Sequence, residues 1–465
     1  MPRARIQRIQ DTVHGLMEFQ GMEGVVIDVL RTRELQRLRR IRQLGLGYLV
    51  FPGAEHSRLV HSLGAAHLAI RFGRHIAEAC RDHLVENLRP GAASIRDLAV
   101  AALCHDLGHG PLSHAWECEI VGDDFPRDKW MSTLGIPEPE RLLLRDSKWH
   151  EIVGHALLAW EDGSLHQLLE QHESGFSRRL RYLLRGEYFL PYLPRLLHGD
   201  IDVDRADFIL RDAFQTGVAY GRYDLGWLIS TCSVGSDDAR LVVGFDQRKS
   251  LRVVEQFLIA RRALYETVYY HKTVHAAEGM VSLFLRRLKE VVREGAKVPA
   301  MQFVEPMIKM ISGEAVGPSE VLALDDFALW VLIEHLSTQS NDETLRDLGR
   351  RILSRDLFKM VPCSSDRIRQ FLERNGSYDR LYDAIQPFCP GKREFYLIAD
   401  FVKTNFLSDE KRAQSYFIDD GRKAVPLREN EWMRAYLQRP EQLARLFTLR
   451  EAVDAVEAVI TSSVR

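Results

Sequence analysis

Apolar residues recur along most of the chain at the three- and four-residue intervals that are typical of amphipathic helices. The clearest run covers residues 31–44, where arginines separate four aliphatic residues: Leu35, Leu38, Ile41 and Leu44. The same spacing predicts helices over 58–86, over 200–216 and over 249–295. The pattern therefore favours a mainly α-helical protein.

A further helix is predicted directly in front of the sequence HDLGHGPLSH. Ser94 is a candidate N-cap, and Asp97 occupies the third position after it, as in a capping box. The apolar run LAVAALC at 98–104 follows, and Gly108 and Pro111 are expected to end the helix. We therefore expect the first histidine and the aspartate of this sequence at the end of a buried helix.

Alternating polar and apolar residues appear only in short stretches. The sequence RLVVGF, preceded by SDDA, predicts a β-hairpin over 231–245. After Pro390, REFYLIADFV and SYFIDD are strand-like, whereas short helical patterns alternate with breaks over 299–388. We expect a helical catalytic domain over 1–295 and a helical or α+β C-terminal lobe over 296–465, with a role in regulation or oligomerisation.

Composition disfavours several classes of protein. The chain has 465 residues, of which 46% are hydrophobic and 28% charged, so it can bury a large core and disorder is disfavoured. Its formal net charge of −2 gives no sign of a nucleic-acid or membrane partner. The six cysteines form no CxxC pair, which disfavours a disulfide framework or a zinc ribbon and favours a reducing compartment. No apolar run approaches the ~18 residues of a membrane span, and the N-terminus lacks the apolar region of a signal peptide, so we expect a cytoplasmic protein.

The sequence HDLGHGPLSH carries the strongest signal for chemistry. His105 and Asp106 follow a run that should be buried, and burying such a pair costs free energy unless it is paired or bound to a cation. Imidazole and carboxylate together suit Mg, Mn, Fe, Ni or Zn. His61 and Asp204 are candidates for further ligands, because a pocket between helices draws its ligands from separate helices. Taken singly, His61 would more often be a core residue and Asp204 a surface or capping acid.

The spacing His105-Asp106-x-x-His109 also resembles the HExxH pattern of zinc proteases. That chemistry needs both histidines on one continuous helical face and a glutamate that reaches the zinc-bound water. Here Gly108 and Pro111 end the helix, and aspartate is one methylene shorter than glutamate. A metalloprotease is therefore disfavoured.

Three segments of the chain resemble a known family. They are LQRLRRIRQLGLGYLVFPGAEHSRLVHSLGAAH at 35–67, LCHDLGHGPLSH at 103–114 and GDIDVDRADFILRD at 199–212. Their ordered combination resembles the HD-domain deoxynucleoside triphosphate triphosphohydrolases, a dGTPase-like family. The resemblance extends over residues 1–290, continues weakly to LFKMV at 357–361, and implies an HD-domain helical core.

The resemblance assigns roles to single residues. It implies four metal ligands: His61, His105, Asp106 and Asp204. Phosphate binding and acid–base catalysis would fall to four further residues: Arg58, His109, His114 and His150. Contacts with the sugar and the phosphates would come from Gln43, Asp212, Arg261 and Tyr269. Of these, Tyr269 would stack against the deoxyribose and exclude a 2′-hydroxyl.

Four positions depart from the family pattern. Arg205 replaces a phosphate-binding lysine, which keeps the charge but changes its geometry. Phe208 replaces a tyrosine beside the sugar, and Tyr270 replaces a glutamine near the 3′-hydroxyl. Arg31 stands where a relative has an acid that selects guanine at an activating site, so activation by a guanine nucleotide is not implied. These changes bear on sugar discrimination and regulation more than on catalysis.

The implied activity is metal-dependent hydrolysis of deoxynucleoside triphosphates to deoxynucleoside and inorganic triphosphate. One alternative is an HD phosphohydrolase of another nucleotide: a ribonucleotide, a monophosphate, a cyclic nucleotide or an alarmone. The other is a non-catalytic protein that binds nucleotides or nucleic acid. A homo-oligomer, dimer or tetramer, and an activating nucleotide are the expected partners. The arginines of 31–44 fit a solvated face, a subunit interface with such a nucleotide, or a single-stranded nucleic-acid groove, which the lack of aromatic residues disfavours.

Overall fold

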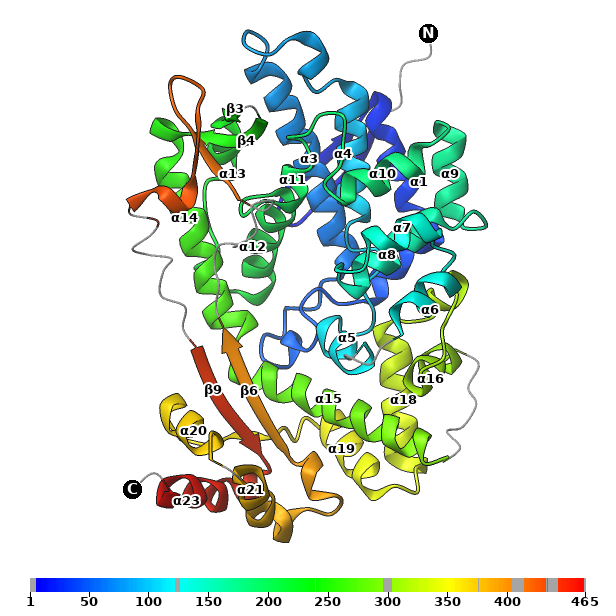
Figure 1. Cartoon of the computed structure of the whole chain (residues 1–465), viewed down its shortest axis with the longest axis vertical. Helices are drawn as coiled ribbons and strands as arrows, with labels where there is room; N and C mark the ends of the chain where they lie inside the picture. Colours follow the sequence, from blue (N-terminus) through cyan, green and yellow to red (C-terminus); the bar gives the residue numbers. More distant parts are fainter. Residues whose placement is uncertain are drawn as a thin grey trace.

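In the computed structural model, the described residues are 6–121, 126–238, 240–295, 303–374, 376–403, 414–431, 433 and 442–463, without the side chains of His114, Lys403 and Gln442. Helices make up most of these residues, and their strands form three small sheets (Figure 1). The predicted fold, a mainly α-helical core with a short β-hairpin and a small α+β C-terminal lobe, is confirmed.

The centre of the fold is a pair of long helices. α3 (Arg58–Ala79) packs against α4 (Ala92–Cys104), and α12 (Val203–Thr216) packs on α3. Every residue of α4 from Ser94 onward is buried, as the apolar run predicts. The predicted N-cap is wrong, because Gly91 caps this helix and its backbone N–H donates to Oγ of Ser94 at 2.9 Å. Ser94 is therefore the third residue of the helix.

The first 240 residues contain further helices of one to three turns. Their bounds are α1 (Val25–Leu30), α2 (Arg33–Arg37), α5 (His114–Ile120), α6 (Arg127–Thr133), α7 (Glu138–Leu143), α8 (Trp149–Ala159), α9 (Ser164–His172), α10 (Phe176–Leu184), α11 (Arg195–His198) and α13 (Leu225–Ser230). A π-helical turn, Tyr265–Tyr269, separates α14 (Gln247–Leu264) from α15 (Lys272–Arg293). The later helices are α16 (Glu305–Ser312), α17 (Pro318–Val321), α18 (Asp326–Gln339), α19 (Glu343–Leu353), α20 (Ser365–Leu372), α21 (Ser377–Ile385) and α23 (Val453–Ser463).

The predicted helix over 31–44 is wrong beyond residue 40. α2 continues into a 3₁₀ turn at Leu38–Arg40, and Ile41 is extended. The backbone here bonds to distant segments instead. The N–H of Arg58 donates to the carbonyl oxygen of Ile41 at 2.9 Å, and the N–H of Arg42 donates to Asp326 at 2.9 Å. These tertiary hydrogen bonds satisfy backbone groups that a helix would otherwise have paired.

The described strands form an N-terminal hairpin, a sheet ordered β3-β4-β7-β8 and a sheet ordered β5-β9-β6. Their bounds are β1 (Gln7–Asp11), β2 (Gly15–Phe19), β3 (Cys232–Asp237), β4 (Arg240–Asp246), β5 (Lys359–Met360), β6 (Leu397–Lys403), β7 (Tyr416–Ile418), β8 (Ala424–Pro426) and β9 (Gln442–Thr448). The pair β3–β4 is the predicted hairpin, whereas the hairpin β1–β2 was not predicted. Strand β7 pairs in parallel with β4, so the C-terminal part of the chain returns to the predicted hairpin.

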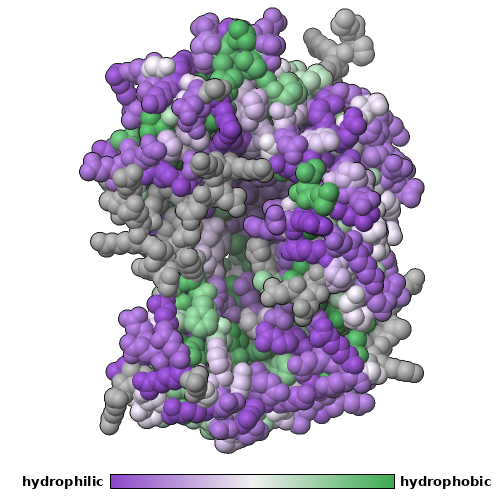
Figure 2. Space-filling model, in the orientation of Figure 1, coloured by the Kyte–Doolittle hydropathy of each residue, from purple (hydrophilic) through white to green (hydrophobic). Residues whose placement is uncertain are grey.

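Most buried apolar side chains belong to one continuous cluster that extends from Met17 to Ile460. Figure 1 shows α15 below the α3–α4 pair and beside strand β6, which it contacts. The face in Figure 2 is largely hydrophilic and is hollowed between the upper helices and this lower sheet. The division into 1–295 and 296–465 stays a prediction. None of the described helices combines the length and the apolar character that a membrane crossing requires.

A buried arginine ties the loop after α4 to the segment before α18. Arg37 is 1% exposed, and burial lowers its pKa to about 10, so it stays charged at neutral pH. Its guanidinium donates to the carbonyl oxygens of Leu107 at 3.1 Å, His109 at 2.6 Å and Leu324 at 2.6 Å. Asp326 adds a second link, because it accepts from the backbone N–H of Leu112 at 2.8 Å.

Replacing Arg37 with methionine should lower the free energy of unfolding by about 3 kcal/mol, because three buried carbonyl oxygens lose a charged donor. Arg39→Met is the matched control, since Arg39 is exposed and donates to Gln36, and it should change the free energy by less than about 0.5 kcal/mol. Urea unfolding followed by circular dichroism measures both. Equal stabilities of the two variants would contradict a structural role for Arg37.

Candidate metal centre

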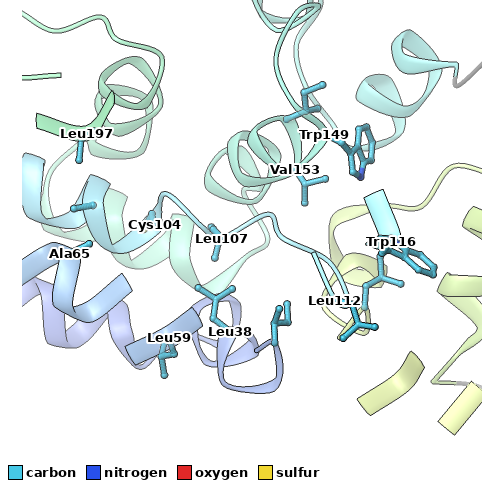
Figure 3. Close-up of a cluster of buried hydrophobic side chains, with 14 of the residues drawn as sticks. Leu38, Leu59, Ala65, Cys104, Leu107, Leu112, Trp116, Trp149, Val153 and Leu197 are labelled. Atoms are coloured by element: carbon cyan, nitrogen blue, oxygen red, sulfur yellow. The ribbon is translucent and has the colours of Figure 1, made fainter. Parts of the chain in front are cut away.

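The sequence HDLGHGPLSH forms a series of turns that leads from the end of α4 into α5. Leu107 and Leu112 anchor these turns in the hydrophobic cluster drawn in Figure 3. Gly108 permits close approach to α8, because a Cβ at this position would lie 1.9 Å from the carbonyl oxygen of His150. Leu112 and Ser113 have φ angles of 46° and 49°, a strained conformation for side chains of these types. The motif is therefore a tight loop held in place from both sides.

Four side chains from three segments meet beside the end of α4. His61 lies on α3, His105 and Asp106 lie on the loop, and Asp204 lies in the first turn of α12. Nε2 of His61 is 3.0 Å from Oδ1 of Asp204 and 3.2 Å from Nε2 of His105. Asp106 lies farther from His61, with its Oδ2 3.9 Å from Nε2 of that residue, and its Oδ1 is 3.3 Å from Nε2 of His105. All four predicted ligands are brought together.

The remaining nitrogens of both imidazoles are occupied by the protein. Nδ1 of His61 lies 2.8 Å from Oδ2 of Asp207, and Nδ1 of His105 lies 2.7 Å from the carbonyl oxygen of Ala102. Both Nε2 atoms are thereby turned toward the same point. Imidazole nitrogens and carboxylate oxygens form a mixed donor set that suits first-row divalent metals. The residues present therefore fit a divalent cation.

Charge compensation is strong within this cluster. Burial opposes the ionisation of Asp204, but hydrogen bonds with His105 and His61 lower its pKa below the ordinary value. Burial likewise disfavours a charged His61, yet hydrogen bonds with Asp204 and Asp207 raise its pKa to about 10. A cation bound here would compete with the proton of His61, so metal affinity should fall as the pH falls.

A second group of titratable side chains lies against the first. The rings of His109 and His150 are stacked with centroids 4.1 Å apart, and Nδ1 of His150 lies 2.9 Å from Oε2 of Glu117. Nε2 of His109 is 3.3 Å from Oδ1 of Asp106, which joins the two groups. Burial and the charge of Arg58 hold the pKa of His109 well below its usual value. Glu117 was missed by sequence reasoning, although a carboxylate in the first turn after the motif was a usable signal.

Two further predicted catalytic residues flank the loop. Arg58, the first residue of α3, donates from Nη1 to Oδ2 of Asp106 at 2.6 Å and from Nε to Oγ of Ser113 at 3.0 Å. Its guanidinium therefore compensates the charge of Asp106 as well as facing the loop. His114 begins α5, but its side chain lies outside the described residues, and its role stays a prediction.

The other two predicted phosphate-binding arginines lie near the start of α12. Arg205 donates to the carbonyl oxygen of Gly199 at 2.9 Å and pairs with Asp202. Arg261 donates to the carbonyl oxygen of Asp200 at 3.3 Å. Both guanidiniums therefore contact the backbone of consecutive residues, and burial and the neighbouring charge of Arg205 lower the pKa of Arg261. Two guanidiniums near the first turn of α12 can contribute to the binding of an anion there.

The predicted sugar-binding residues gather around Asp212. Its Oδ2 accepts a hydrogen bond from the hydroxyl of Tyr269 at 2.6 Å, and its Oδ1 lies 2.8 Å from Nε2 of His56. The ring of Phe208 packs edge-on against Tyr269 at 6.0 Å and against His61 at 6.4 Å, measured between centroids. This aromatic group therefore adjoins the candidate metal ligands. His56 was missed, because only its contact across the fold reveals its role.

Gln43 and Tyr270 complete the predicted set. Oε1 of Gln43 is buried and has no hydrogen-bond partner within the described part of the chain, a condition that a bound ligand would relieve. The ring of Tyr270 faces that of Tyr265 at 5.5 Å, and its carbonyl oxygen accepts from Arg445 at 2.7 Å. Arg445 also pairs with Asp400. Strands β6 and β9 therefore support residues 265–270, which we call the tyrosine segment.

Comparison with known proteins found several relatives. The chain is 31% identical to YwfO of Bacillus subtilis, an uncharacterized protein, over 360 residues, which are 76% of this chain and 71% of YwfO. It is 27% identical to bovine deoxynucleoside triphosphate triphosphohydrolase SAMHD1 over 449 residues, 91% of this chain and 71% of that protein. The human protein of the same name is 30% identical over 76% of this chain and 54% of its own length. The chain belongs to the HD-domain dNTPase-like family.

Solved structures share the fold of this HD-domain dNTPase-like protein. A phosphohydrolase from Bacteroides thetaiotaomicron has a TM-score of 0.72 and 24% identity, covering 96% of this chain and 100% of that one. A hypothetical protein from Aquifex aeolicus has a TM-score of 0.67 and 24% identity, covering 98% and 100%. No protein-family profile matches the chain. Family membership makes the protein an HD-type phosphohydrolase, in which the His–Asp cluster is a candidate divalent metal site.

Structural roles account for half of the arginines of residues 31–42. Arg37 is buried, Arg40 pairs with Asp325, and Arg42 pairs with Glu55 at 2.8 Å. The other three are exposed: Arg31, Arg33 and Arg39. The stretch therefore presents fewer free charges than its sequence suggests.

Equilibrium dialysis against Mn²⁺ should show about one bound ion per chain, because two imidazole nitrogens and two carboxylates converge on one point. Asp204→Asn should weaken binding at least ~100-fold, since it removes a carboxylate whose Oδ1 lies 3.0 Å from Nε2 of His61 and 3.5 Å from Nε2 of His105. Asp224→Asn is the matched control, because Asp224 caps α13 and an asparagine oxygen can still accept from Trp227. Unchanged Mn²⁺ affinity in Asp204→Asn would contradict the assignment.

Proposed function

We propose that the protein hydrolyses deoxynucleoside triphosphates to deoxynucleoside and inorganic triphosphate. The proposal rests on one observation above all. The cluster of His61, His105 and Asp204 has Arg205 next to it on α12, Arg261 bonded to the carbonyl oxygen of Asp200 just before that helix, and the ring of Phe208 beside the ring of His61. A triphosphate joined to a deoxynucleoside has the charges and the ring to match these neighbours. The bovine and human relatives, which carry the name of this activity, support the same assignment.

The metal ligands in this proposal are His61, His105, Asp106 and Asp204. A divalent cation at this site would polarise a phosphoryl oxygen and acidify a water. Arg58 keeps Asp106 ionised and oriented, since it donates to Oδ2 at 2.6 Å. Arg205, Arg261 and His150 would spread the negative charge of the phosphate chain. His109 or His114 would protonate the leaving oxygen.

The sugar in this proposal lies between the tyrosine segment and α12. Tyr269 is held by its hydrogen bond to Asp212 and is packed against Phe208, so its ring has a fixed direction. Such a ring would stack against the deoxyribose and exclude a 2′-hydroxyl. Gln43, whose Oε1 is buried without a partner among the described residues, would contact the sugar together with Asp212.

A second candidate function is hydrolysis of another nucleotide: a ribonucleotide, a monophosphate, a cyclic nucleotide or an alarmone. Phe208 and Tyr270 favour it, because they alter the hydrogen bonds available to the sugar. The ring of Tyr270 packs on Tyr265, so it presents an aromatic surface where the family pattern has an amide. We also propose a cytoplasmic homo-oligomer, dimer or tetramer, with an activating nucleotide as effector.

Product analysis separates the two functions. The purified protein is incubated in Mn²⁺ with each dNTP, NTP, monophosphate and cyclic nucleotide, and the products are resolved by chromatography. We expect deoxynucleoside and inorganic triphosphate from dNTPs, whereas release of monophosphate or inorganic phosphate supports the second function.

His105→Ala should lower kcat at least ~100-fold, because it removes a metal ligand. His172→Ala is its control, since His172 is exposed. A folded His105→Ala variant with wild-type dGTP turnover would refute the mechanism.

Replacing Tyr269 with alanine should raise the ratio of kcat/KM for NTPs over dNTPs about 10-fold, because the ring that excludes a 2′-hydroxyl is removed. Tyr220→Ala provides the control, since Tyr220 is exposed. Steady-state rates for dGTP and GTP give both ratios. An unchanged ratio in Tyr269→Ala would contradict the role of Tyr269 in excluding a 2′-hydroxyl.

A further inference from the structure

A carboxylate outside the predicted ligand set contacts His61 from behind. Asp207 is fully buried on α12, three residues after Asp204. Its Oδ2 lies 2.8 Å from Nδ1 of His61, while Oδ1 of Asp204 lies 3.0 Å from Nε2 of the same ring. Side chains three residues apart share a helical face. One face of α12 thus contacts both ring nitrogens of His61, through Asp204 and Asp207.

Asp207 is itself held by residues from distant parts of the chain. Arg211, on the next turn of α12, donates to Oδ2 at 2.8 Å and to Oδ1 at 2.9 Å. His14, in the turn of the β1–β2 hairpin, places Nε2 2.6 Å from Oδ1. Asp11 on β1 in turn accepts from Nη1 of Arg211 at 2.9 Å. A buried carboxylate with this many partners keeps one orientation and stays ionised.

The packing of α3 makes room for this arrangement. Gly64 faces Asp207, and a Cβ added to Gly64 would lie 1.9 Å from Oδ1 of Asp207 and 2.5 Å from Nη2 of Arg211. Neither group can move away, because both are buried and hydrogen-bonded. Only glycine fits at this position of α3. His61 lies one turn before Gly64 on α3. The approach of Asp207 to His61 therefore depends on the glycine.

The geometry fixes which nitrogen of His61 carries a proton. An ionised carboxylate can only accept, so Nδ1 of His61 must donate to Asp207. A neutral imidazole then has its lone pair on Nε2, which faces Asp204 and His105. Metal-binding histidines commonly use such a carboxylate at the outer nitrogen, which fixes the tautomer and the ring orientation.

We propose that Asp207 is a positioning residue for the metal centre, which holds His61 with Nδ1 protonated and Nε2 directed at the cation. The N-terminal hairpin contacts Asp207 directly through His14. This inference rests on the metal dependence in the proposed function, but it concerns a residue that does not touch the cation or the substrate.

The decisive pair of variants is Asp207→Asn and Asp11→Asn. Both remove one negative charge from the buried contacts of Arg211. Asp11→Asn leaves the contact between Asp207 and His61 intact, and its amide oxygen can still accept from the backbone N–H groups of Val13 and His14. Mn²⁺ affinity is measured by equilibrium dialysis, and thermal unfolding shows how much each variant is destabilised.

We expect Asp207→Asn to bind Mn²⁺ about 10- to 100-fold more weakly than wild type. Metal affinity typically falls by this factor when a metal-binding histidine loses its carboxylate partner. Asp11→Asn should keep wild-type affinity even if both variants lose stability. An equal loss of affinity in both variants, or none in Asp207→Asn, overturns the positioning role while leaving the metal site in place. Failure of the wild-type protein to bind Mn²⁺ would instead overturn the proposed function, and this inference with it.

A measurement on the wild-type protein settles the tautomer if Asp207→Asn does not fold. The ¹⁵N chemical shifts of the histidine rings in the Zn²⁺-loaded protein report which nitrogen carries hydrogen, and His61→Gln assigns the signal. We expect His61 to be protonated on Nδ1. Protonation on Nε2, with Nδ1 toward the cation, overturns the proposal.

Discussion

Asp106, Asp204 and Asp207 are brought together in the interior between α3, α12 and the loop after α4, where an unpaired negative charge would be costly. Each is kept ionised by a different partner: Arg58 for Asp106, the two imidazoles for Asp204, and Arg211 for Asp207. The partners in turn come from α3, from the loop after α4 and from α12 itself. The requirement to compensate these charges explains why α3, α12 and the N-terminal hairpin must pack in one register.

Helix α12 carries several of the candidate functional residues on a short stretch of chain. Its functional candidates recur at intervals of three and four residues and therefore share one face of the helix: Asp204, Asp207, Phe208, Arg211 and Asp212. From the N-terminal end onward, this face offers a metal ligand, a carboxylate behind His61, an aromatic ring and the carboxylate that holds Tyr269. A metal candidate and the sugar candidates thus lie in order along one face of the helix.

Local pattern predicted the elements that local forces determine. The run at 98–104 is buried and helical, and the loop that follows it begins where the glycines require. The helix expected over 31–44 was wrong, because hydrogen bonds from Arg42 to Asp326 and from Arg58 to Ile41 are invisible to local spacing. The hairpin β1–β2 was missed for a similar reason, since its residues pack on a distant helix. Family resemblance supplied the ligand set, whereas His56 and Asp207 required the contacts themselves.

The clamp formed by Arg37 and Asp326 has a consequence for the protein while it is being made. The histidines of the loop emerge from the ribosome early, but the carbonyl of Leu324 and the carboxylate of Asp326, which complete the loop's anchorage, follow some two hundred residues later. Chains emerge in order from the N-terminus. A nascent chain therefore carries the loop without these two contacts until the segment before α18 has emerged.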